Sequence, residues 1–185
     1  MASTTAFEKL RTSHPHAAPL RGANADPPHL QADPVQAALA HLAAHCRKMP
    51  PVAALGVKPL GYDGRILRLG APLSANLNDK GCAFGGSLSG LMTLAGWGWI
   101  TLRLQLQGIA ADVYVADSQV KYIAPLFDDL IAEAMPAAGE SWETFVETLD
   151  RYGKARIAMQ ARIPMNAGGE SAVLTGRFVA MRPMR

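Results

Sequence analysis

The sequence predicts an α+β domain in which a curved antiparallel sheet wraps around one long helix, and three observations support this prediction. First, the uncharged segment 83–102 is apolar on nearly all faces, as expected of a helix at the centre of a fold. Second, the segment 154–165 alternates apolar with polar residues, which is typical of a strand with one buried face. Third, a Gly/Asp turn at 61–64 joins two short extended runs ahead of the helix, which indicates a hairpin.

The N-terminal part is expected to contain a mobile tail and one short helix. Residues 1–30 are rich in Pro, Ala, Ser and His without sustained periodicity, so we expect them to lie outside a single domain formed by residues 31–185. Asp33 is a candidate N-cap, with Pro34 at the first helical position. Pro50 and Pro51 are expected to close this helix. Its apolar positions recur every three or four residues: Val35, Leu39, Leu42, Cys46 and Met49.

The remaining elements follow in chain order. Extended runs at 57–60 and 65–69 form the predicted hairpin, and a polar loop at 74–81 leads into the long helix, which we expect from Phe84 to about Leu106. A short helix is expected at 141–152 from the spacing of its large apolar residues. The predicted strands after the long helix are 113–123, 130–135, 154–165 and 171–181.

Composition excludes several classes of function. The formal charge of +3 comes from scattered Lys and Arg, so we expect no nucleic-acid partner. The cysteines are only Cys46 and Cys82, without the spacing of a metal site, and all five histidines precede the long helix; we expect neither a metal nor a cofactor. The first residues lack the apolar core of a signal peptide, and the glycines and hydroxyls of segment 83–102 make it a poor membrane span. A cytoplasmic location is predicted.

Residues 78–86 read Asn-Asp-Lys-Gly-Cys-Ala-Phe-Gly-Gly and resemble the opening of the central helix in hot-dog-fold thioesterases. The usual pattern there is Asn-x-x-Gly-x-x-His-Gly-Gly, so Phe84 stands in place of the histidine. Residues 117–125 resemble the following strand, which often ends in a Tyr-x-x-Pro turn. Phe-Gly-Gly-Ser-Leu at 84–88 and Ala-Gly-Trp at 95–97 resemble a bacterial thioesterase subgroup, some members of which follow an acetyltransferase-like domain. The resemblance covers about 55–182 and implies a hot-dog fold.

This resemblance, together with the chemistry of thioester hydrolysis, indicates candidate site residues. At the helix start, backbone N–H groups without partners can stabilise negative charge on a carbonyl oxygen, and Gly86 and Ser87 are the predicted donors. Gly85 and Phe84 are expected to lie against the substrate, since a glycine permits close approach. The alternative interpretation is that the glycines only permit tight packing. Thr93 occupies the position where many such enzymes carry a carboxylate, and it is a candidate for holding a water or contacting substrate.

Two asparagines and two aspartates remain open alternatives. Asn78 is expected to orient a water or the thioester carbonyl, with Asn76 as an equal competitor, and either could instead stabilise a loop turn. Asp117 is the preferred candidate for a general base, because it falls on the strand face shared with Val113 and Val115. Its ordinary alternative is an ion pair with a nearby cation. Asp79 is the second candidate.

The resemblance implies an acyl-thioester hydrolase that acts on acyl-CoA or acyl carrier protein (acyl-ACP) at a site shared between two subunits. One alternative is a protein that binds acyl thioesters without turnover, because Phe84 and Thr93 replace the usual histidine and carboxylate. Another is a structural partner in fatty-acid synthesis, which the acetyltransferase fusions of the similar subgroup suggest. We expect a homodimer that extends its sheet, with a tetramer as the alternative assembly.

Overall fold

The computed structural model describes residues 33–183, and the expected tail at 1–30 lies outside these residues. Three elements precede the hairpin loop. Helix α1 (Pro34–Lys48) begins as predicted, with the Asp33 side chain accepting from Val35 N at 2.9 Å. Helix α2 (Pro50–Ala54) was not predicted: the two prolines close α1, but proline also fits the first turn of a helix. Strand β1 (Lys58–Tyr62) follows.

The predicted hairpin, long helix and strands are confirmed. Strand β2 (Leu67–Ala71) pairs with β1, and the turn lies at 63–66 rather than 61–64. A short 3-10 turn, η1 (Leu73–Ala75), leads toward α3 (Gly85–Leu106). The later elements are β3 (Asp112–Tyr122), β4 (Leu130–Pro136), α4 (Trp142–Tyr152), β5 (Lys154–Pro164) and β6 (Glu170–Met181).

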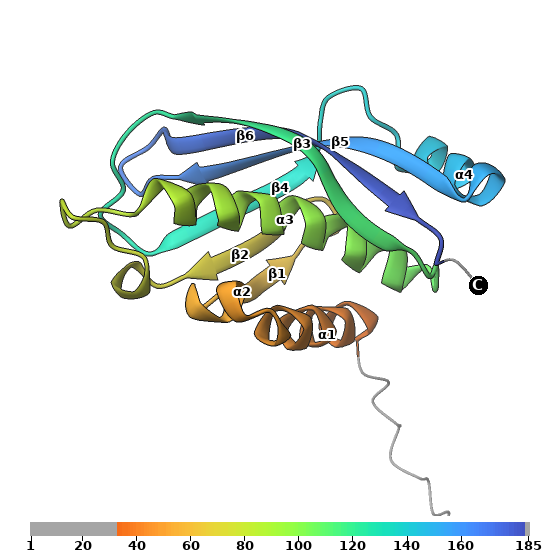
Figure 1. Ribbon diagram of the computed structural model, residues 1–185, viewed down its shortest axis with the longest axis horizontal. Helices are drawn as coiled ribbons and strands as arrows, with labels where there is room; N and C mark the ends of the chain where they lie inside the picture. Colours follow the sequence, from red (N-terminus) through yellow and green to blue (C-terminus); the bar gives the residue numbers. More distant parts are fainter. Residues whose placement is uncertain (1–32, 184–185) are drawn as a thin grey trace, which may run out of the picture. The chain divides into compact units, whose positions relative to one another are not determined.

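The strands form one antiparallel sheet in the order β1-β2-β4-β5-β6-β3, which curves around α3 (Figure 1). Because consecutive residues of β5 alternate between the two faces, its apolar residues meet α3 while Arg156, Gln160 and Arg162 face outward. The edge strands of the sheet are β1 and β3. Although β3 is the first strand after α3 in the sequence, it lies at the far edge of the sheet.

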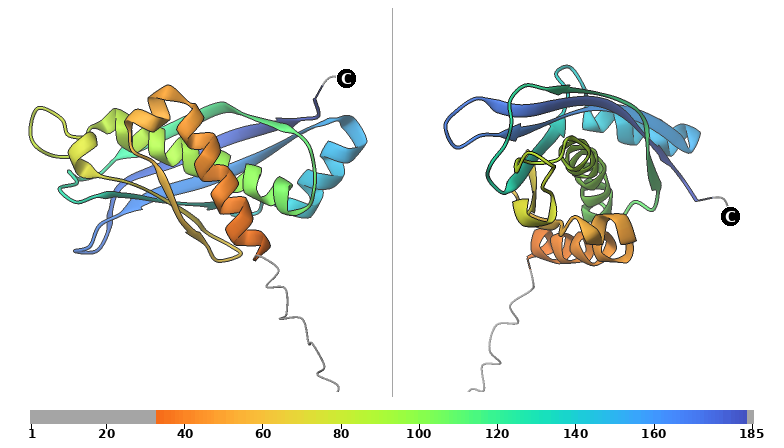
Figure 2. Two further views of the ribbon diagram at one scale, coloured as in Figure 1. Left: turned by 90° about the horizontal axis from the view of Figure 1, so that it is seen from below. Right: turned by 60° about the vertical axis from the view of Figure 1, so that its left-hand side comes forward.

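Helix α3 lies between the sheet and α1 (Figure 2). Two glycines of α3 allow side chains of neighbouring elements to approach the helix closely from opposite sides. A Cβ at Gly96 would lie 2.8 Å from the Phe178 ring of β6, and a Cβ at Gly98 would lie 3.1 Å from Leu67 and 3.3 Å from Leu42 of α1. The helix is therefore buried around most of its circumference, which explains why its sequence is apolar on nearly all faces.

Helix α4 covers the C-terminal part of α3. It begins at the Ser141 N-cap and ends at Gly153, whose φ of 68° suits a glycine at a helix C-terminus. Trp142 packs edge-on against Trp99 of α3 with ring centroids 5.4 Å apart, and the Arg103 guanidinium lies over both rings. This packing joins the start of α4 to the C-terminal half of α3.

Candidate functional site at the start of helix α3

The start of α3 presents backbone donors without protein acceptors. Phe84 is the N-cap and contributes no side-chain hydrogen bond. Its carbonyl accepts from Ser87 N at 3.0 Å and from Leu88 N at 3.1 Å. Within residues 33–183, the N–H groups of Gly85 and Gly86 have no acceptor. Of the two donors predicted from the sequence, Gly86 is free whereas Ser87 is already engaged, and Gly85 takes its place beside Gly86.

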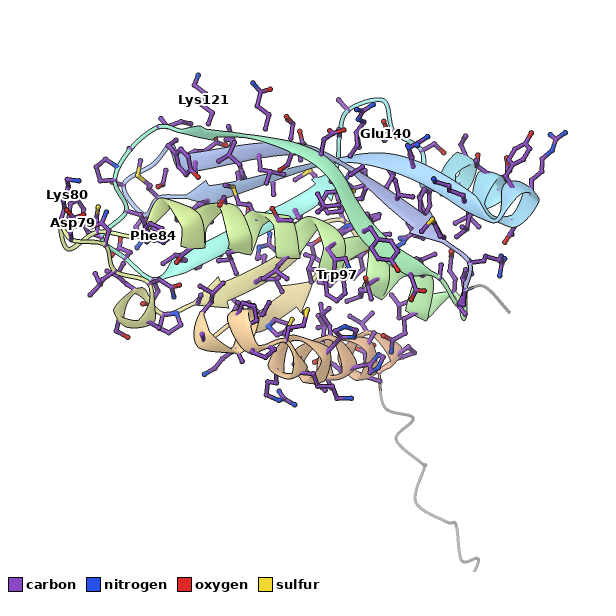
Figure 3. The ribbon with its side chains drawn as sticks, viewed as in Figure 1. Asp79, Lys80, Phe84, Trp97, Lys121 and Glu140 are labelled. Carbon is purple, nitrogen blue, oxygen red and sulfur yellow. The ribbon has the colours of Figure 1, made fainter. Side chains whose placement is uncertain are left out.

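Two aromatic rings cover the glycines from their side-chain directions. The Phe84 ring fills the space over Gly86, and the Tyr122 ring lies 3.4 Å from the Cβ position of Gly85. The Tyr122 hydroxyl also donates to Gly85 O at 3.1 Å. Both glycines thus have a packing reason to be glycine, in addition to any role of their N–H groups. Figure 3 shows Phe84 beside Asp79 and Lys80 at this end of the helix.

Four exposed apolar side chains surround the helix start. Phe84 and Tyr122 cover the glycines, Leu77 pairs through its backbone with Ala83, and Phe127 follows Leu126, whose carbonyl accepts from Ala83 N at 2.8 Å. We call Leu77, Phe84, Tyr122 and Phe127 the apolar collar. Each is at least half exposed, which is unusual for neighbouring residues of this size. Phe84 was expected from the sequence, and Tyr122 belongs to the Tyr-x-x-Pro resemblance, whereas no sequence signal indicates Leu77 or Phe127.

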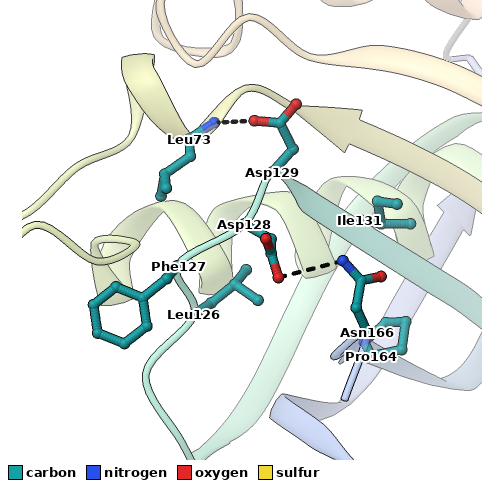
Figure 4. Close-up of a pocket in the computed structure, with 8 residues that line it drawn as sticks. All are labelled: Leu73, Leu126, Phe127, Asp128, Asp129, Ile131, Pro164 and Asn166. Atoms are coloured by element: carbon teal, nitrogen blue, oxygen red, sulfur yellow. Dashed lines mark hydrogen bonds between the residues drawn. The ribbon is translucent and has the colours of Figure 1, made fainter. Parts of the chain in front are cut away.

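A cavity of about 460 Å³ lies beside the collar (Figure 4). Its walls come from η1, from the loop 126–129 and from the turn between β5 and β6. Asp129 accepts from Leu73 N at 2.8 Å, and Asp128 accepts from the Asn166 amide at 3.3 Å. The cavity is lined by Leu73, Leu126, Phe127, Asp128, Asp129, Ile131, Pro164 and Asn166. The fold thus places two carboxylates, those of Asp128 and Asp129, in a loop beside the helix start. Sequence spacing did not identify these two residues.

Asn76 ties three segments together beneath the helix start. Its side chain is buried, and its amide donates to Leu55 O at 3.0 Å and to Pro72 O at 2.8 Å. Its main-chain carbonyl accepts from Phe84 N at 2.7 Å. Within the described part of the chain, its side-chain oxygen has no donor. Asn76 therefore fixes the backbone direction of Phe84, and burial withholds its amide from direct contact with a substrate at the surface.

Asn78 stabilises its own loop. Its side-chain oxygen accepts from Lys80 N at 2.8 Å and Cys82 N at 3.2 Å, and its amide donates to Cys82 Sγ at 3.1 Å. These bonds are those of the loop-turn alternative, and they hold Cys82 and Ala83 ahead of the helix. Thr93 likewise has an internal bond, because its hydroxyl donates to Ser89 O at 2.9 Å one helical turn earlier.

Asp117 lies on the opposite face of the sheet from the one expected. The pairing of β3 with β6 shifts between Val115 and Asp117, so that Ala116 is an extra residue in a β-bulge. Asp117 consequently pairs with Arg177, which points away from α3, whereas Val115 pairs with the buried Phe178. The expectation that Asp117 shares a face with Val113 and Val115 is wrong, since strict alternation along the strand fails at the bulge.

The environment of Asp117 also lowers its basicity. The Arg177 guanidinium donates to its carboxylate from Nε at 2.8 Å and from Nη2 at 2.5 Å. These hydrogen bonds hold the pKa of Asp117 below its usual range. Within one chain, Asp117 therefore has the alternative role named above, an ion pair with a nearby cation, here Arg177. Asp79 is largely exposed in the loop and lies 3.7 Å from the Lys80 ammonium.

Residues 33–183 contain no group of three His, Cys, Asp or Glu side chains placed to hold a metal ion. In the same residues no helix is both long and apolar enough to cross a membrane. The site at the start of α3 thus consists of backbone donors, aromatic rings and loop carboxylates.

An antiparallel sheet curved around a long helix that begins with two glycines defines a hot-dog-fold protein. Residues 39–182 match the family described as "Putative thioesterase (yiiD_Cterm)", and the chain belongs to this family. The fold and the thioester-hydrolase family inferred from the residues at 84–88 and 95–97 are therefore confirmed.

Solved structures share this architecture. A protein of unknown function from Chlorobaculum tepidum TLS is 31% identical, with a TM-score of 0.75 over 81% of this chain and 97% of that one. A putative thioesterase from Shewanella oneidensis is 26% identical, with a TM-score of 0.72 over 80% of this chain and 99% of its own. A thioesterase from Haemophilus influenzae, 14% identical with a TM-score of 0.61 over 80% and 92% of the two chains, shares the fold.

Proposed function

We propose that the protein hydrolyses acyl thioesters carried by CoA or by an acyl carrier protein, and that the reaction takes place at the start of α3. The observation that carries this proposal is the pair of N–H groups at Gly85 and Gly86, which have no acceptor among residues 33–183. They lie at the positive end of a 22-residue helix dipole, where negative charge is stabilised. The membership of a thioesterase family supports the same chemistry.

In this proposal a water molecule attacks the thioester carbonyl and gives up a proton to solvent water, and the carbonyl oxygen becomes negatively charged. The Gly85 and Gly86 N–H groups donate to that oxygen, and collapse of the intermediate expels the thiolate of the carrier. A thiol has an ordinary pKa near 8.5, so the leaving group needs less protonation than an amine or an alkoxide. Asn76 acts by holding Phe84 and thereby the direction of both donors.

The apolar collar supports an acyl substrate. Leu77, Phe84, Tyr122 and Phe127 expose large apolar surfaces around the two donors, where an alkyl chain would remove them from water. The Phe84 and Tyr122 rings define the width of the approach to Gly86 and Gly85, respectively. Phe84 therefore serves as a substrate-binding residue in this proposal, in the position where related enzymes carry histidine.

We further propose a homodimer that forms through β3. This edge strand has 11 residues, most of them exposed, and β6 is the one strand it pairs with among residues 33–183. The other edge strand, β1, is poorly suited to pairing because Pro59 lacks an N–H and a register shift interrupts the strand between Pro59 and Gly61. Association through β3 would place a partner subunit near Tyr122. Light scattering of the wild type and of variants in the β3 edge distinguishes a monomer, a dimer and the alternative tetramer.

The two free, buried cysteines are compatible with the proposed cytoplasmic location.

A second candidate function is acyl-thioester binding without turnover, for example by a partner protein in fatty-acid synthesis. It is favoured by the lack of any carboxylate on α3 and by the engagement of Asp117 with Arg177. Direct measurement of thiol release separates the two functions.

The test is thiol release from acyl-CoA and acyl-ACP of graded chain length, with a matched pair of variants at Gly85. Gly85→Pro removes one donor, yet proline fits the first helical position, and Phe84 already has an extended conformation (ψ 130°) compatible with a following proline. Gly85→Ala keeps the N–H and adds the same Cβ. We expect the proline variant to lose about 10²–10³ in kcat relative to the alanine variant. Equal rates would exclude the Gly85 donor, and absence of thiol release from every substrate would favour binding alone.

A further inference from the structure

A second concave site lies between the end of α1 and the start of β1. These two elements contact each other and lie next to each other in Figure 1. It has a volume of about 540 Å³, within the range of about 300–1,000 Å³ that is usual for small-molecule sites. We call it the α1–β1 cleft. Its lining residues are Ala43, Cys46, Arg47, Ala53, Gly56, Val57, Lys58 and Pro59.

The interior of the α1–β1 cleft is apolar. Cys46 and Val57 are buried, and burial raises the pKa of the Cys46 thiol, so this group stays neutral. Space remains because Ala43 and Ala53 carry only a methyl group. Gly56 has a φ of 71°, and a Cβ there would lie 3.0 Å from Pro72, so a larger residue is excluded by both conformation and space. An alkyl chain would find complementary surface here.

Two cations flank this apolar surface, and the lining contains no carboxylate. Among the described residues, neither Arg47 nor Lys58 forms an ion pair or a side-chain hydrogen bond. On the outer sheet face, Arg68, Arg162 and Arg177 are paired with carboxylates, whereas Arg156 of the same face forms no ion pair among the described residues. Arg47 lies in the last turn of α1 and complements the helix dipole, but Lys58 belongs to β1 and has no such role. The fold therefore brings two cations from separate elements to one apolar cleft.

We propose that the α1–β1 cleft binds an alkyl monocarboxylate, with the carboxylate between Arg47 and Lys58 and the chain against the accessible side chains of Ala43, Ala53 and Pro59. Charge complementarity selects an anion, and the apolar interior selects an alkyl chain over a purely polar ion. The cleft shares no residue with the start of α3. The proposal is therefore independent of the thioesterase assignment, and ligand binding to the cleft can be measured in the absence of turnover.

The test is calorimetric titration of the full chain with decanoate. We expect binding with a Kd below about 1 mM, and a loss of at least about tenfold in affinity in the variant Arg47→Gln/Lys58→Gln. Lys48→Gln is the matched control, because Lys48 is a neighbouring cation of α1 that does not line the cleft, and it should leave the affinity unchanged. Ala53→Phe, at an exposed lining position, should fill the cleft and abolish binding while thermal unfolding shows an intact fold.

Two further titrations separate the contributions of charge and chain. Methyl decanoate and inorganic phosphate should each bind at least about tenfold more weakly than decanoate, since one lacks the charge and the other the chain. Equal decanoate affinity in the wild type and in the Ala53→Phe variant would overturn the proposal. The proposal would also be overturned if decanoate binding were lost in Phe84→Ala but retained in Ala53→Phe. That result would place the ligand at the start of α3 and not in the α1–β1 cleft.

Discussion

The ring of Phe84 occupies the side-chain space of Gly86: a Cβ on Gly86 would lie 2.3 Å from its Cε1 atom. The residue that replaces the usual histidine and the glycine two positions later therefore depend on each other. Since the Phe84 side chain is 55% exposed, the ring can swing outward at little cost in packing. This coupling permits a direct test of whether the ring position affects catalysis.

We predict that Gly86→Ala displaces the Phe84 ring and lowers kcat/KM by about tenfold, because the collar changes shape while the Gly86 N–H is retained. In the Phe84→Ala background the same Gly86 substitution should have almost no effect, since the clash is gone. Kinetics of the four proteins form a double-mutant cycle. Additive effects of the two substitutions would contradict the proposed contact.

Two glycines of α3 should respond to alanine in opposite directions. At Gly96 a Cβ would meet the buried Phe178 ring at 2.8 Å, so Gly96→Ala should lower the free energy of unfolding by about 1–3 kcal/mol. At Gly90 the nearest atom lies at 3.8 Å, so Gly90→Ala should be stabilising by up to about 1 kcal/mol through helix propensity. Chemical denaturation measures both, and a stable Gly96→Ala protein would show that the packing around Phe178 relaxes.

Asp117→Asn should leave thiol release within about threefold of the wild type, because the carboxylate faces outward and is bound by Arg177. The pH profile of kcat should also keep its shape. A large loss of kcat together with a changed acidic limb would instead identify Asp117 as a base acting from one subunit on the site of its partner. Arg177→Gln is the control for loss of the ion pair alone.

Glu133 should make stability depend on pH. Partial burial opposes its ionisation, but hydrogen bonds from Arg162 and Arg68 outweigh that effect and lower the pKa of Glu133. A lowered folded-state pKa gives stability that is present above the unfolded-state value near 4.3 and is lost as pH falls through the folded-state value. At about pH 7, Glu133→Gln should cost roughly 1–3 kcal/mol.

The measurement is the gap in unfolding free energy between the wild type and Glu133→Gln, followed from about pH 7 to about pH 3. The gap should shrink toward acid, because protonated Glu133 and Gln are alike in shape and charge. A gap of constant size would mean that the side chain acts through packing and not through its two arginine partners.

The elements of the fold could be predicted because their signals are local. An Asp33 cap, a Gly/Asp turn and a helix apolar on all faces each act within a few residues. Helix α2 was missed because Pro50 and Pro51 can either end one helix or begin another, and the local sequence does not distinguish these outcomes.

Only the part of the candidate site that lies in one continuous segment of the chain could be predicted from the sequence. The glycines of α3 were identified from their spacing, but Phe127 reaches the helix start through a backbone bond between distant loops. The side of the sheet on which Asp117 lies depends on a bulge at Ala116, and a single inserted residue reverses the alternation of the strand. The engagement of Ser87 N with Phe84 O likewise depends on the tightness of the first turn, which composition does not encode.

The bonds of Asn76 to Leu55, Pro72 and Phe84 also have a consequence for protein engineering. A shortened protein that starts at β1 would keep every strand and all of α3, yet it would lack the Leu55 carbonyl and leave one N–H of the buried Asn76 amide without its acceptor, while the bond to Pro72 O remains. A fragment that keeps all bonds of Asn76 must therefore include Leu55, which directly follows α2. Fusions to other domains should be joined before α1, whose Leu42 packs against α3 at Gly98, and not in the loop that precedes β1.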